Sequence, residues 1–294
     1  MKSYDVIILG GGPAGASAGI YVRRAGSSVL VLDNGNSKLK RARTVQNYYG
    51  FEDISGDELL KLGVKQLTRL GAEIKDEEVL EITNNFDNHT YTVITTKDSY
   101  TSKAIILCIG AGKKKSVDGL EPYENANVSY CAICDGFLYR GKKVAVIGDG
   151  EFACHEAEHL SKNAKEVYLI GKISKEISKL SKNIKVIDKN IASFEGNGLL
   201  ESIVFEDNSK LNIDGLFVAL GSLSGFELAK QLGIITTNNT IVVDQFAMTN
   251  LPGVFAAGDA IGGINQVSTA VGEGARAGLE AVRYIKVLEG DEEK

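Results

Sequence analysis

Two glycine-rich turns constrain this chain most. They are Gly10–Gly15 and Gly148–Ala153, and each follows a short apolar run and precedes a helical pattern. The flanking runs, which we expect to be strands and helices, are Asp5–Leu9, Ala16–Ala25 and Ser28–Leu32 for the first turn and Val144–Ile147, Phe152–Leu160 and Glu166–Ile170 for the second. Strand, glycine turn, helix and strand together form the βαβ unit of dinucleotide-binding domains. The pattern therefore predicts this architecture twice in one chain.

The duplicated pattern indicates the α/β class, with two Rossmann-like domains of the two-dinucleotide-binding-domain type, the second inserted in the first. A chain of 294 residues can build two hydrophobic cores. No linker rich in Pro or Ser separates the two units, and further apolar runs follow at Gly215–Leu220 and Gly253–Ala257. The simplest arrangement builds the first domain from residues 1–114 and 243–294 and the middle domain from residues 115–242.

Composition excludes several classes of protein. The formal net charge is −5 and the sequence pI is near 5.4, whereas a nucleic-acid-binding surface normally carries a basic excess. No apolar stretch is long enough to span a bilayer, so we expect no membrane association. The chain runs almost at once into a predicted strand, so we expect no signal peptide and a cytoplasmic location. In a reducing compartment, a close cysteine pair is more often catalytic or metal-binding than structural.

The first glycine turn fits the G-x-G-x-x-G pattern in its required strand–turn–helix context. Glycines allow a tight turn and a close approach of the backbone to a pyrophosphate, which the helix N-terminus attracts. Asp33 closes the second strand, where a carboxylate can accept hydrogen bonds from a ribose. The alternative is a glycine-rich turn without a ligand. The flanking strands and the terminal acid favour a nucleotide site.

The only close cysteine pair is Cys131-Ala132-Ile133-Cys134. Two intervening residues allow a disulfide that is easily opened and closed, and a lowered thiolate pKa makes exchange fast. A zinc knuckle would need four ligands, and Cys108 and Cys154 are single residues inside a predicted strand and a predicted helix. A structural disulfide is disfavoured in the cytoplasm. The pattern therefore favours a redox-active pair.

One further motif matches a metal-site pattern but lies in the wrong structural context. His155-Glu156-Ala157-Glu158-His159 satisfies the H-E-x-x-H pattern of zinc proteases. Its helix directly follows a Rossmann-type glycine turn, which is the wrong context for that motif. We interpret these five residues as a polar, solvated helix face and predict no metal site.

Several short segments carry a resemblance to a known family. Cys131–Gly136 is close to the family signature Cys-Ala-Thr-Cys-Asp-Gly, and Gly253–Asp259 resembles its second flavin motif. Asn265-Gln266-Val267 resembles the family's Arg-Gln-Ala, with Asn265 in place of Arg. Ile109-Gly110-Ala111 resembles its Thr-Gly-Ala crossing between domains. Together with Asn47 and Ile54-Ser55-Gly56, the match covers nearly the whole chain. It resembles the low-molecular-weight thioredoxin reductases.

The resemblance implies an FAD-binding first domain and a middle domain of NAD(P)H type that carries the cysteine pair. It implies that Cys134 sits next to the flavin, that Cys131 attacks the disulfide of a thioredoxin partner, and that Asp135 is the nearby acid–base group. The middle domain would rotate between these two encounters, and the enzyme would be a homodimer. The FAD contacts that the resemblance implies are Gly10, Gly12, Pro13, Ala14, Gly15, Asp33, Asn34, Asn47, Gly110, Gly258, Asp259, Gln266 and Val267.

The second glycine turn keeps the spacing of the family's NADPH loop but not its chemistry. Asp149 puts a carboxylate where the family has a small residue, and Glu151 adds a second charge. Two anions at a helix N-terminus compete with a pyrophosphate for the same donors and repel it. Phe152 replaces a small hydroxyl residue where we expect the nucleotide to pass. These changes predict a degenerate nucleotide site.

The strand that follows this loop also departs from the family. Gly171–Lys175 contains only lysines where the family has arginines that clamp the 2′-phosphate, and Lys lacks the bidentate fork of Arg. No acid closes this strand, so NAD is not an easy substitute. Gly221–Ser224 lacks the family's Gly-His-x-Pro-Asn run. We therefore expect that nicotinamide binding has been lost.

That combination resembles the ferredoxin-dependent flavin thioredoxin reductases of anaerobic bacteria, which keep the flavin and the cysteine pair. A flavin can accept single electrons from ferredoxin and deliver a pair to a disulfide. Three alternatives stay open. They are an NADPH-dependent thioredoxin reductase with a divergent site, a flavin dithiol oxidase that uses oxygen, and a non-catalytic flavoprotein that senses redox state.

Overall fold

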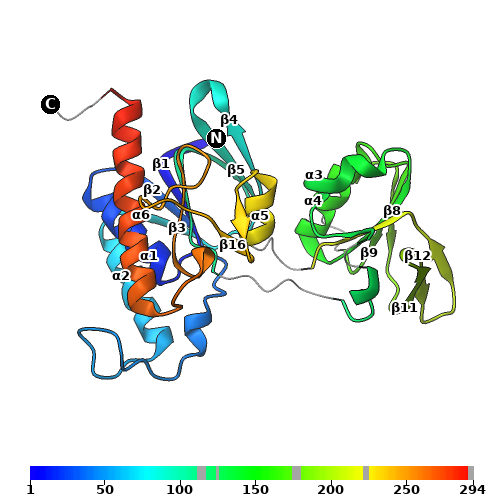
Figure 1. Cartoon of the computed structure of the whole chain (residues 1–294), viewed down its shortest axis with the longest axis horizontal. Helices are drawn as coiled ribbons and strands as arrows, with labels where there is room; N and C mark the ends of the chain where they lie inside the picture. Colours follow the sequence, from blue (N-terminus) through cyan, green and yellow to red (C-terminus); the bar gives the residue numbers. More distant parts are fainter. Residues whose placement is uncertain (111–116, 124–125, 174–179, 221–224, 291–294) are drawn as a thin grey trace. The chain divides into compact units, whose positions relative to one another are not determined.

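The computed structural model describes residues 1–110, 117–123, 126–173, 180–220 and 225–290. The chain divides into two compact units (Figure 1), which are residues 1–112 with 224–294, and residues 113–223. The sequence pattern placed the return to the first unit at residue 243. In the structure it comes earlier, because α5 (Gly225–Gln231) contacts β4 (Val79–Asn85) and β16 (Thr240–Ile241) contacts η5 (Gly258–Ile261).

The first unit is built on a seven-stranded sheet. Five of its strands are parallel, and two antiparallel strands extend one edge of the sheet. The order is β3 (Glu73–Lys75), β2 (Val29–Leu32), β1 (Lys2–Leu9), β6 (Ser99–Leu107), β5 (Thr90–Thr95) and β4, with β17 (Val254–Ala256) paired to the end of β6. The apolar ends of β1, β2 and β6 are buried, as expected for parallel strands covered on both faces.

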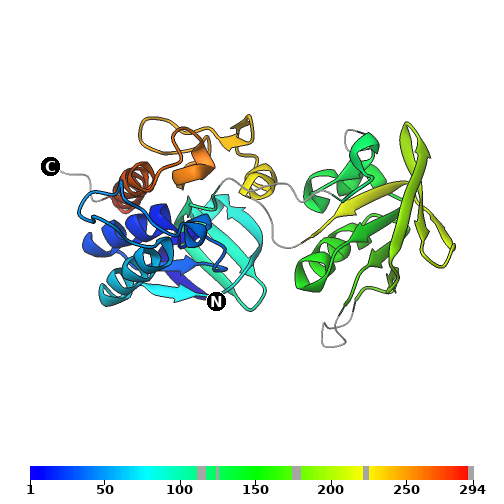
Figure 2. The same cartoon turned by 90° about the horizontal axis from the view of Figure 1, so that it is seen from below.

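Two helices of the first unit pack unusually closely (Figures 1 and 2). They are α1 (Pro13–Arg24), which follows the first glycine turn, and the long α6 (Val267–Leu288). A side chain at Gly274 or Gly278 of α6 would meet the backbone oxygen of Ala14 or Ala18 at 2.1 Å or 2.6 Å. Glycine at these two positions therefore lets the N-terminal and C-terminal segments of the chain share one core.

The second unit has a five-stranded parallel sheet in the order β10 (Ile184–Ile187), β9 (Glu166–Ile170), β8 (Lys143–Ile147), β14 (Gly215–Val218) and β7 (Val128–Ser129). Its helices α3 (Ala132–Asp135) and α4 (Gly150–Ser161) lie on one side of this sheet (Figure 2). A three-stranded antiparallel sheet, β11 (Ile191–Asn197), β12 (Leu199–Phe205) and β13 (Lys210–Asn212), packs against it through Leu200, Ile203 and Phe205.

The remaining elements are short except for α2 (Gly56–Arg69), which follows the loop after β2. They are η1 (Lys38–Arg41), η2 (Phe86–Asn88), η3 (Glu121–Tyr123), η4 (Gly136–Tyr139) and β15 (Thr236–Thr237). Within the described residues, no helix combines the length and the apolar character that crossing a membrane requires. The α/β class with two Rossmann-like units, expected from the sequence, is confirmed, and the sheet of the first unit is mixed at one edge.

Candidate active site

The first glycine turn connects β1 to α1 in a conformation that only glycine allows. Gly10 has a φ of +100°, and a side chain there would meet the Cys108 backbone oxygen at 2.3 Å. A side chain at Gly15 would meet the Gly10 oxygen at 1.8 Å. At Gly12, by contrast, the nearest atom would be the Ser37 Oγ at 3.6 Å. The turn is therefore closed on the protein side and open on the side where α1 begins.

The N-terminus of α1 is ready for an anion. Gly12 caps the helix without any side-chain hydrogen bond, Pro13 opens it, and its first turn contains no acidic residue. The N–H of Gly11 donates to the Asp33 Oδ1 at 3.1 Å, so this carboxylate stands at the end of β2 beside the turn. Asn34, the next residue, is exposed. This is the arrangement in which a pyrophosphate meets free N–H groups and a ribose meets a carboxylate.

The late glycine–aspartate motif lies against the same helix. Gly258, with a φ of +73°, begins η5, and a side chain there would meet the Ala14 Cβ at 2.9 Å. The Gly258 N–H donates to Glu273 of α6 at 2.9 Å, and burial raises the pKa of the Glu273 carboxyl above its ordinary value. Asp259 pairs with Lys38 at 3.6 Å. Sequence reasoning missed Glu273, whose helical position alone carries no signal.

The N-terminus of α6 completes this arrangement. Gln266 caps α6 by accepting a hydrogen bond from the backbone N–H of Thr269, while its own N–H donates to the Thr269 Oγ1 at 3.3 Å. The Asn47 Nδ2 donates to the Gln266 Oε1 at 2.8 Å, which joins two segments far apart in the sequence. Val267 is the first residue of the helix. Gly110, with a φ of +68°, follows β6, while its neighbour Ala111 lies outside the described residues.

These observations test whether a flavin dinucleotide suits the first unit. The open turn at Gly12, the uncapped start of α1 and the Asp33 carboxylate suit its adenosine and pyrophosphate parts. Asp259 and the amide pair of Asn47 and Gln266 add polar side chains close to the second helix N-terminus. The residues present therefore fit the cofactor that the resemblance implies.

The cysteine pair lies at the start of α3 in the second unit. Cys131 and Cys134 form a disulfide, with their Cα atoms 5.3 Å apart. Cys131 occupies the N-cap position of α3, and its Sγ accepts a hydrogen bond from the Cys134 N–H at 3.2 Å. Cys131 is buried, and Cys134 is half-buried. A thiolate at this N-cap position could accept the same hydrogen bond.

Asp135 reaches the pair through a serine. The Ser129 Oγ donates to the Asp135 Oδ2 at 2.6 Å and accepts the Cys131 N–H at 3.1 Å. Sequence reasoning missed Ser129, although it lies only two residues before the motif. The Ser129 hydroxyl thereby links the Asp135 carboxylate to the backbone of Cys131.

A second carboxylate forms a hydrogen bond with the backbone of the cysteine motif. Glu156 of α4 accepts the Ala132 N–H through its Oε2 at 2.7 Å, and the residue is only 1 % exposed. The sequence pattern placed Glu156 on a solvated helix face, and that interpretation was wrong. Glu156 is buried because it satisfies a backbone donor of the cysteine motif that α4 covers.

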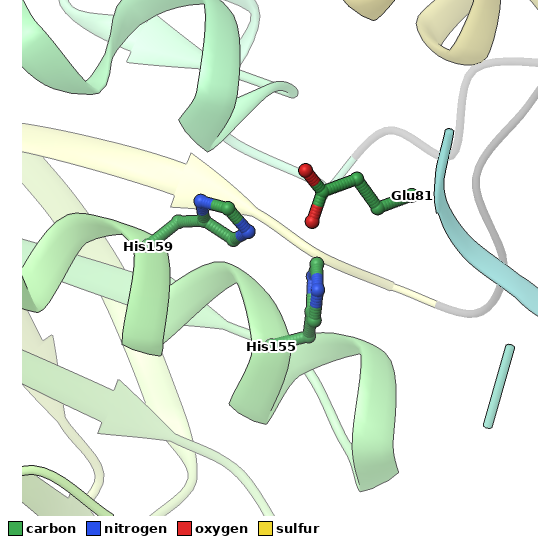
Figure 3. Close-up of side chains that lie close together, drawn as sticks. All are labelled: Glu81, His155 and His159. Carbon is green, nitrogen blue, oxygen red and sulfur yellow. The ribbon is translucent and has the colours of Figure 1, made fainter. Parts of the chain in front are cut away.

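The two histidines flanking Glu156 lie one turn apart on the same face of α4 (Figure 3), with ring centroids 4.6 Å apart. Both are half-buried, so this face too is less solvated than expected. The zinc-protease pattern would need its glutamate beside the histidines' metal. Glu156 instead turns to the Ala132 N–H.

The two other cysteines are chemically distinct from the pair. Cys108 in the first unit and Cys154 in the second are both buried free thiols. Burial raises the pKa of Cys108 to about 12 and that of Cys154 to about 11. Both thiols therefore stay protonated near neutral pH and are poor nucleophiles.

The second glycine turn has the backbone of a nucleotide loop with a carboxylate in its centre. A side chain at Gly148 would meet the Ala219 oxygen at 2.1 Å, so β8 and β14 pack tightly there. Asp149 caps α4 but makes no side-chain cap hydrogen bond. Its Oδ1 instead accepts the Lys172 N–H, at 2.6 Å, at the end of β9. Asp149 thus occupies a backbone donor at the strand end where a nucleotide ribose would lie.

Other predicted features of this second site have mixed outcomes. Glu151 is exposed in the first turn of α4. Phe152 is only 4 % exposed, so it is part of the packed interior rather than an exposed obstacle on the loop. Lys172 is exposed. Ser174, Lys175 and Gly221–Ser224 lie outside the described residues.

Comparisons with known proteins show which family the chain resembles over its length. A family profile described as pyridine nucleotide-disulphide oxidoreductase matches residues 4–274. The thioredoxin reductase of Listeria monocytogenes is 30% identical over 98% of this chain and 95% of its own length.

Two solved structures are similar over the whole length. The atypical thioredoxin reductase from Desulfovibrio vulgaris Hildenborough is 37% identical, with a TM-score of 0.87 over 96% of this chain and 98% of its own. A ferredoxin-flavin thioredoxin reductase from Clostridium acetobutylicum is 30% identical, with a TM-score of 0.70 over 98% of this chain and 99% of its own.

Proposed function

The chain belongs to the pyridine nucleotide-disulphide oxidoreductase family, and we propose that it is an FAD-dependent thioredoxin reductase that takes its electrons from reduced ferredoxin. Homologous thioredoxin reductases are FAD-dependent flavoproteins, and this chain shares their fold. The observation that carries the choice of donor is the Asp149 carboxylate inside the second glycine turn.

We assign FAD to the first unit. Gly10–Gly15 and Asp33 would hold its adenosine and pyrophosphate parts, and Asp259 with Gln266 would face its flavin side. When bound, FAD can accept electrons singly and pass an electron pair to a disulfide. The protein supplies the turn that admits the pyrophosphate and the two helix N-termini that stabilise its charge.

The second unit carries the exchange chemistry. Two electrons and two protons convert the Cys131–Cys134 disulfide to two thiols. The Cys131 thiolate then attacks the thioredoxin disulfide, and Cys134 resolves the mixed disulfide and restores the starting bond. We assign to Asp135, whose carboxylate accepts the Ser129 hydroxyl, the uptake and return of a proton at the cysteine pair.

Three observations support ferredoxin over NADPH. The Asp149 and Glu151 carboxylates stand at the N-terminus of α4, where they would repel a pyrophosphate. The Lys172 N–H at the end of β9 is already engaged by Asp149. Similarity to the ferredoxin-flavin thioredoxin reductase extends over nearly the whole chain. A homodimer, which the family resemblance implies, and a cytoplasmic location, which we expect from the sequence, are further parts of this proposal.

One observation favours an NADPH-dependent thioredoxin reductase as the second candidate. The close packing at Gly148 and Gly171 keeps the backbone of a nucleotide loop, so the loss concerns side chains rather than the fold. The two donors therefore need a direct kinetic comparison.

Anaerobic stopped-flow bleaching of the flavin band makes that comparison. The purified enzyme is mixed with NADPH and, separately, with reduced ferredoxin. We expect rapid bleaching by ferredoxin alone, followed by thioredoxin reduction that Cys134→Ser abolishes. Rapid bleaching by micromolar NADPH would sink the ferredoxin assignment, and oxygen consumption with a dithiol substrate would point to an oxidase.

A further inference from the structure

Four cations are concentrated in six residues of the first unit. Lys38, Lys40, Arg41 and Arg43 all lie between residues 38 and 43, which we term the basic segment, and all four are exposed. The chain as a whole carries a formal net charge of −5. A positive cluster of this density creates a local field opposite in sign to the net charge of the chain.

The fold holds this segment so that its cations face solvent. Leu39 and Ala42, the two apolar residues between the cations, are half-buried. The Ala42 N–H donates to the Leu39 oxygen at 2.9 Å, and the Ala42 oxygen accepts the Gly56 N–H at 2.9 Å. A side chain at Gly56 would meet the Leu39 oxygen at 1.8 Å. The start of α2 therefore anchors the apolar side of the segment and leaves the charged side outward.

Most of these cations do not form ion pairs within the described part of the chain. Within the described part of the chain, only Lys38 of the four forms an ion pair, with Asp259 at 3.6 Å. The nearby Asp57 is already paired with Lys61 at 2.6 Å. Lys40, Arg41 and Arg43 thus keep their charges available to an external partner.

The segment adjoins the residues assigned to FAD. It lies in the chain between Asp33 and Asn47, in the blue loop that follows β2 (Figure 1). The neighbouring Ser37 is the residue that faces the open side of the turn at Gly12, and Lys38 contacts Asp259. The basic segment is therefore in contact with Asp259, a residue that we assign to the cofactor.

We propose that the basic segment is the docking surface for a small acidic one-electron carrier protein. This rests on the proposed ferredoxin-dependent function and names the surface that ferredoxin would use. Opposite charges steer diffusional encounter and raise association rates, and weak redox complexes need only a small contact area. Two carrier molecules would each deliver one electron. These two electrons, together with two protons, reduce the Cys131–Cys134 disulfide to two thiols.

The test compares two charge-reversal variants of the holoenzyme. The first is K40E/R41E/R43E, which leaves Lys38 and its Asp259 contact in place. The matched control is K162E/K165E/K182E, at three exposed lysines of the second unit. Each substitution replaces +1 by −1, so both variants change the net charge by 3 × −2 = −6, from −5 to −11. The flavin content of each variant is measured first, because it must equal that of the wild type.

Two readouts follow at low ionic strength. The first is stopped-flow flavin bleaching, with a photoreduced acidic ferredoxin and, in parallel, with reduced methyl viologen, which needs no docking surface. The second is calorimetric binding of oxidised ferredoxin. We expect K40E/R41E/R43E to slow reduction by ferredoxin about 10- to 100-fold, to weaken its binding similarly and to flatten the salt dependence. Reduction by methyl viologen should be unchanged, and the control variant should lose far less.

The outcomes distinguish an error in the proposed docking surface from an error in the proposed electron donor. If ferredoxin reduces the wild type and K40E/R41E/R43E at equal rates, the docking surface is wrong and the proposed donor stands. The surface is also overturned if the variant loses thioredoxin affinity instead, or if both triple variants slow equally. If NADPH rather than ferredoxin reduces the wild type, the proposed function fails first.

Discussion

Each of the two glycine turns of this chain has a carboxylate beside it, and the position of that carboxylate differs between the two turns. In the first turn the central residue is Gly11, and its N–H donates to Asp33 at the end of the neighbouring strand. In the second the central residue is Asp149, and its carboxylate accepts the N–H of Lys172 at the end of the neighbouring strand. A side chain at Gly11 would lie 2.8 Å from Asp33, and one at Gly171 would lie 2.7 Å from Asp149. The acid and the glycine have exchanged places.

This exchange supports the two different functions that we propose for one backbone fold. A carboxylate at the strand end can accept ribose hydroxyls and leaves the turn open for a pyrophosphate. A carboxylate in the centre of the turn, at the N-terminus of the helix, would repel a pyrophosphate there. The two turns therefore differ in the position of this carboxylate, while the close strand packing is kept in both units.

The largest effect is expected when the second arrangement is built into the first turn. Gly11→Asp/Asp33→Gly would place the carboxylate in the turn and keep a glycine opposite it. We expect FAD affinity to fall at least 100-fold, about 2.7 kcal/mol, so the protein should purify without its flavin absorption. Circular dichroism checks that the fold is retained. A folded double variant with one flavin per chain would contradict our explanation of the difference.

The converse change tests the second turn. Asp149→Gly removes the repelling charge and frees the Lys172 N–H, so we expect NADPH affinity to rise about tenfold, or about 1.4 kcal/mol. Asp149→Asn separates the two causes, because it removes the charge but keeps an oxygen acceptor for Lys172. Fluorescence titration with NADPH measures both variants. No gain in either variant would mean that Glu151 or the strand-end lysines dominate the loss.

Each unit also contains a glutamate that accepts a hydrogen bond from a backbone N–H, of the cysteine motif in one unit and of the late glycine–aspartate motif in the other. The two glutamates differ in burial. Glu156 supports Ala132 and is 1 % exposed, whereas Glu273 supports Gly258 and is half-buried. Glu156→Ala leaves a buried donor unsatisfied and should lower the free energy of unfolding by about 1–3 kcal/mol. Glu156→Gln and Glu273→Ala should cost less. Denaturant unfolding monitors all three, and an equal loss at both sites would show that burial does not set the cost.

The smallest expected effect concerns the buried thiol of the first unit. Burial raises the pKa of Cys108 from the ordinary 9.0 to about 12. Between these values the unfolded thiol loses its proton while the folded thiol keeps it, so stability should fall as the pH rises above 9. Melting temperatures of wild type and Cys108→Ala from pH 8 to 10.5 test this. The variant should decline less steeply, and parallel curves would argue against a role for Cys108.

Local sequence patterns determined a large part of this protein. The apolar runs and glycine turns predicted both βαβ units, because strand, turn and helix preferences act over a few residues. The Cys131–Cys134 pair and Asp33 were identified for the same reason. Ser129 was missed and Glu156 was wrongly assigned to a solvated face, since no local pattern separates a polar residue that will bond a motif from one that will face solvent.

Only the tertiary structure decided the contacts between distant segments. The sheet order brings the end of β9 beside the second turn, which gives Asp149 its partner 23 residues away. The same is true of Asn47 with Gln266 and of the glycine contacts that join α1 to α6. The sequence by itself established that two nucleotide-type units and a redox-type cysteine pair exist. Which donors each carboxylate engages depends on long-range packing, and that packing distinguishes the two turns.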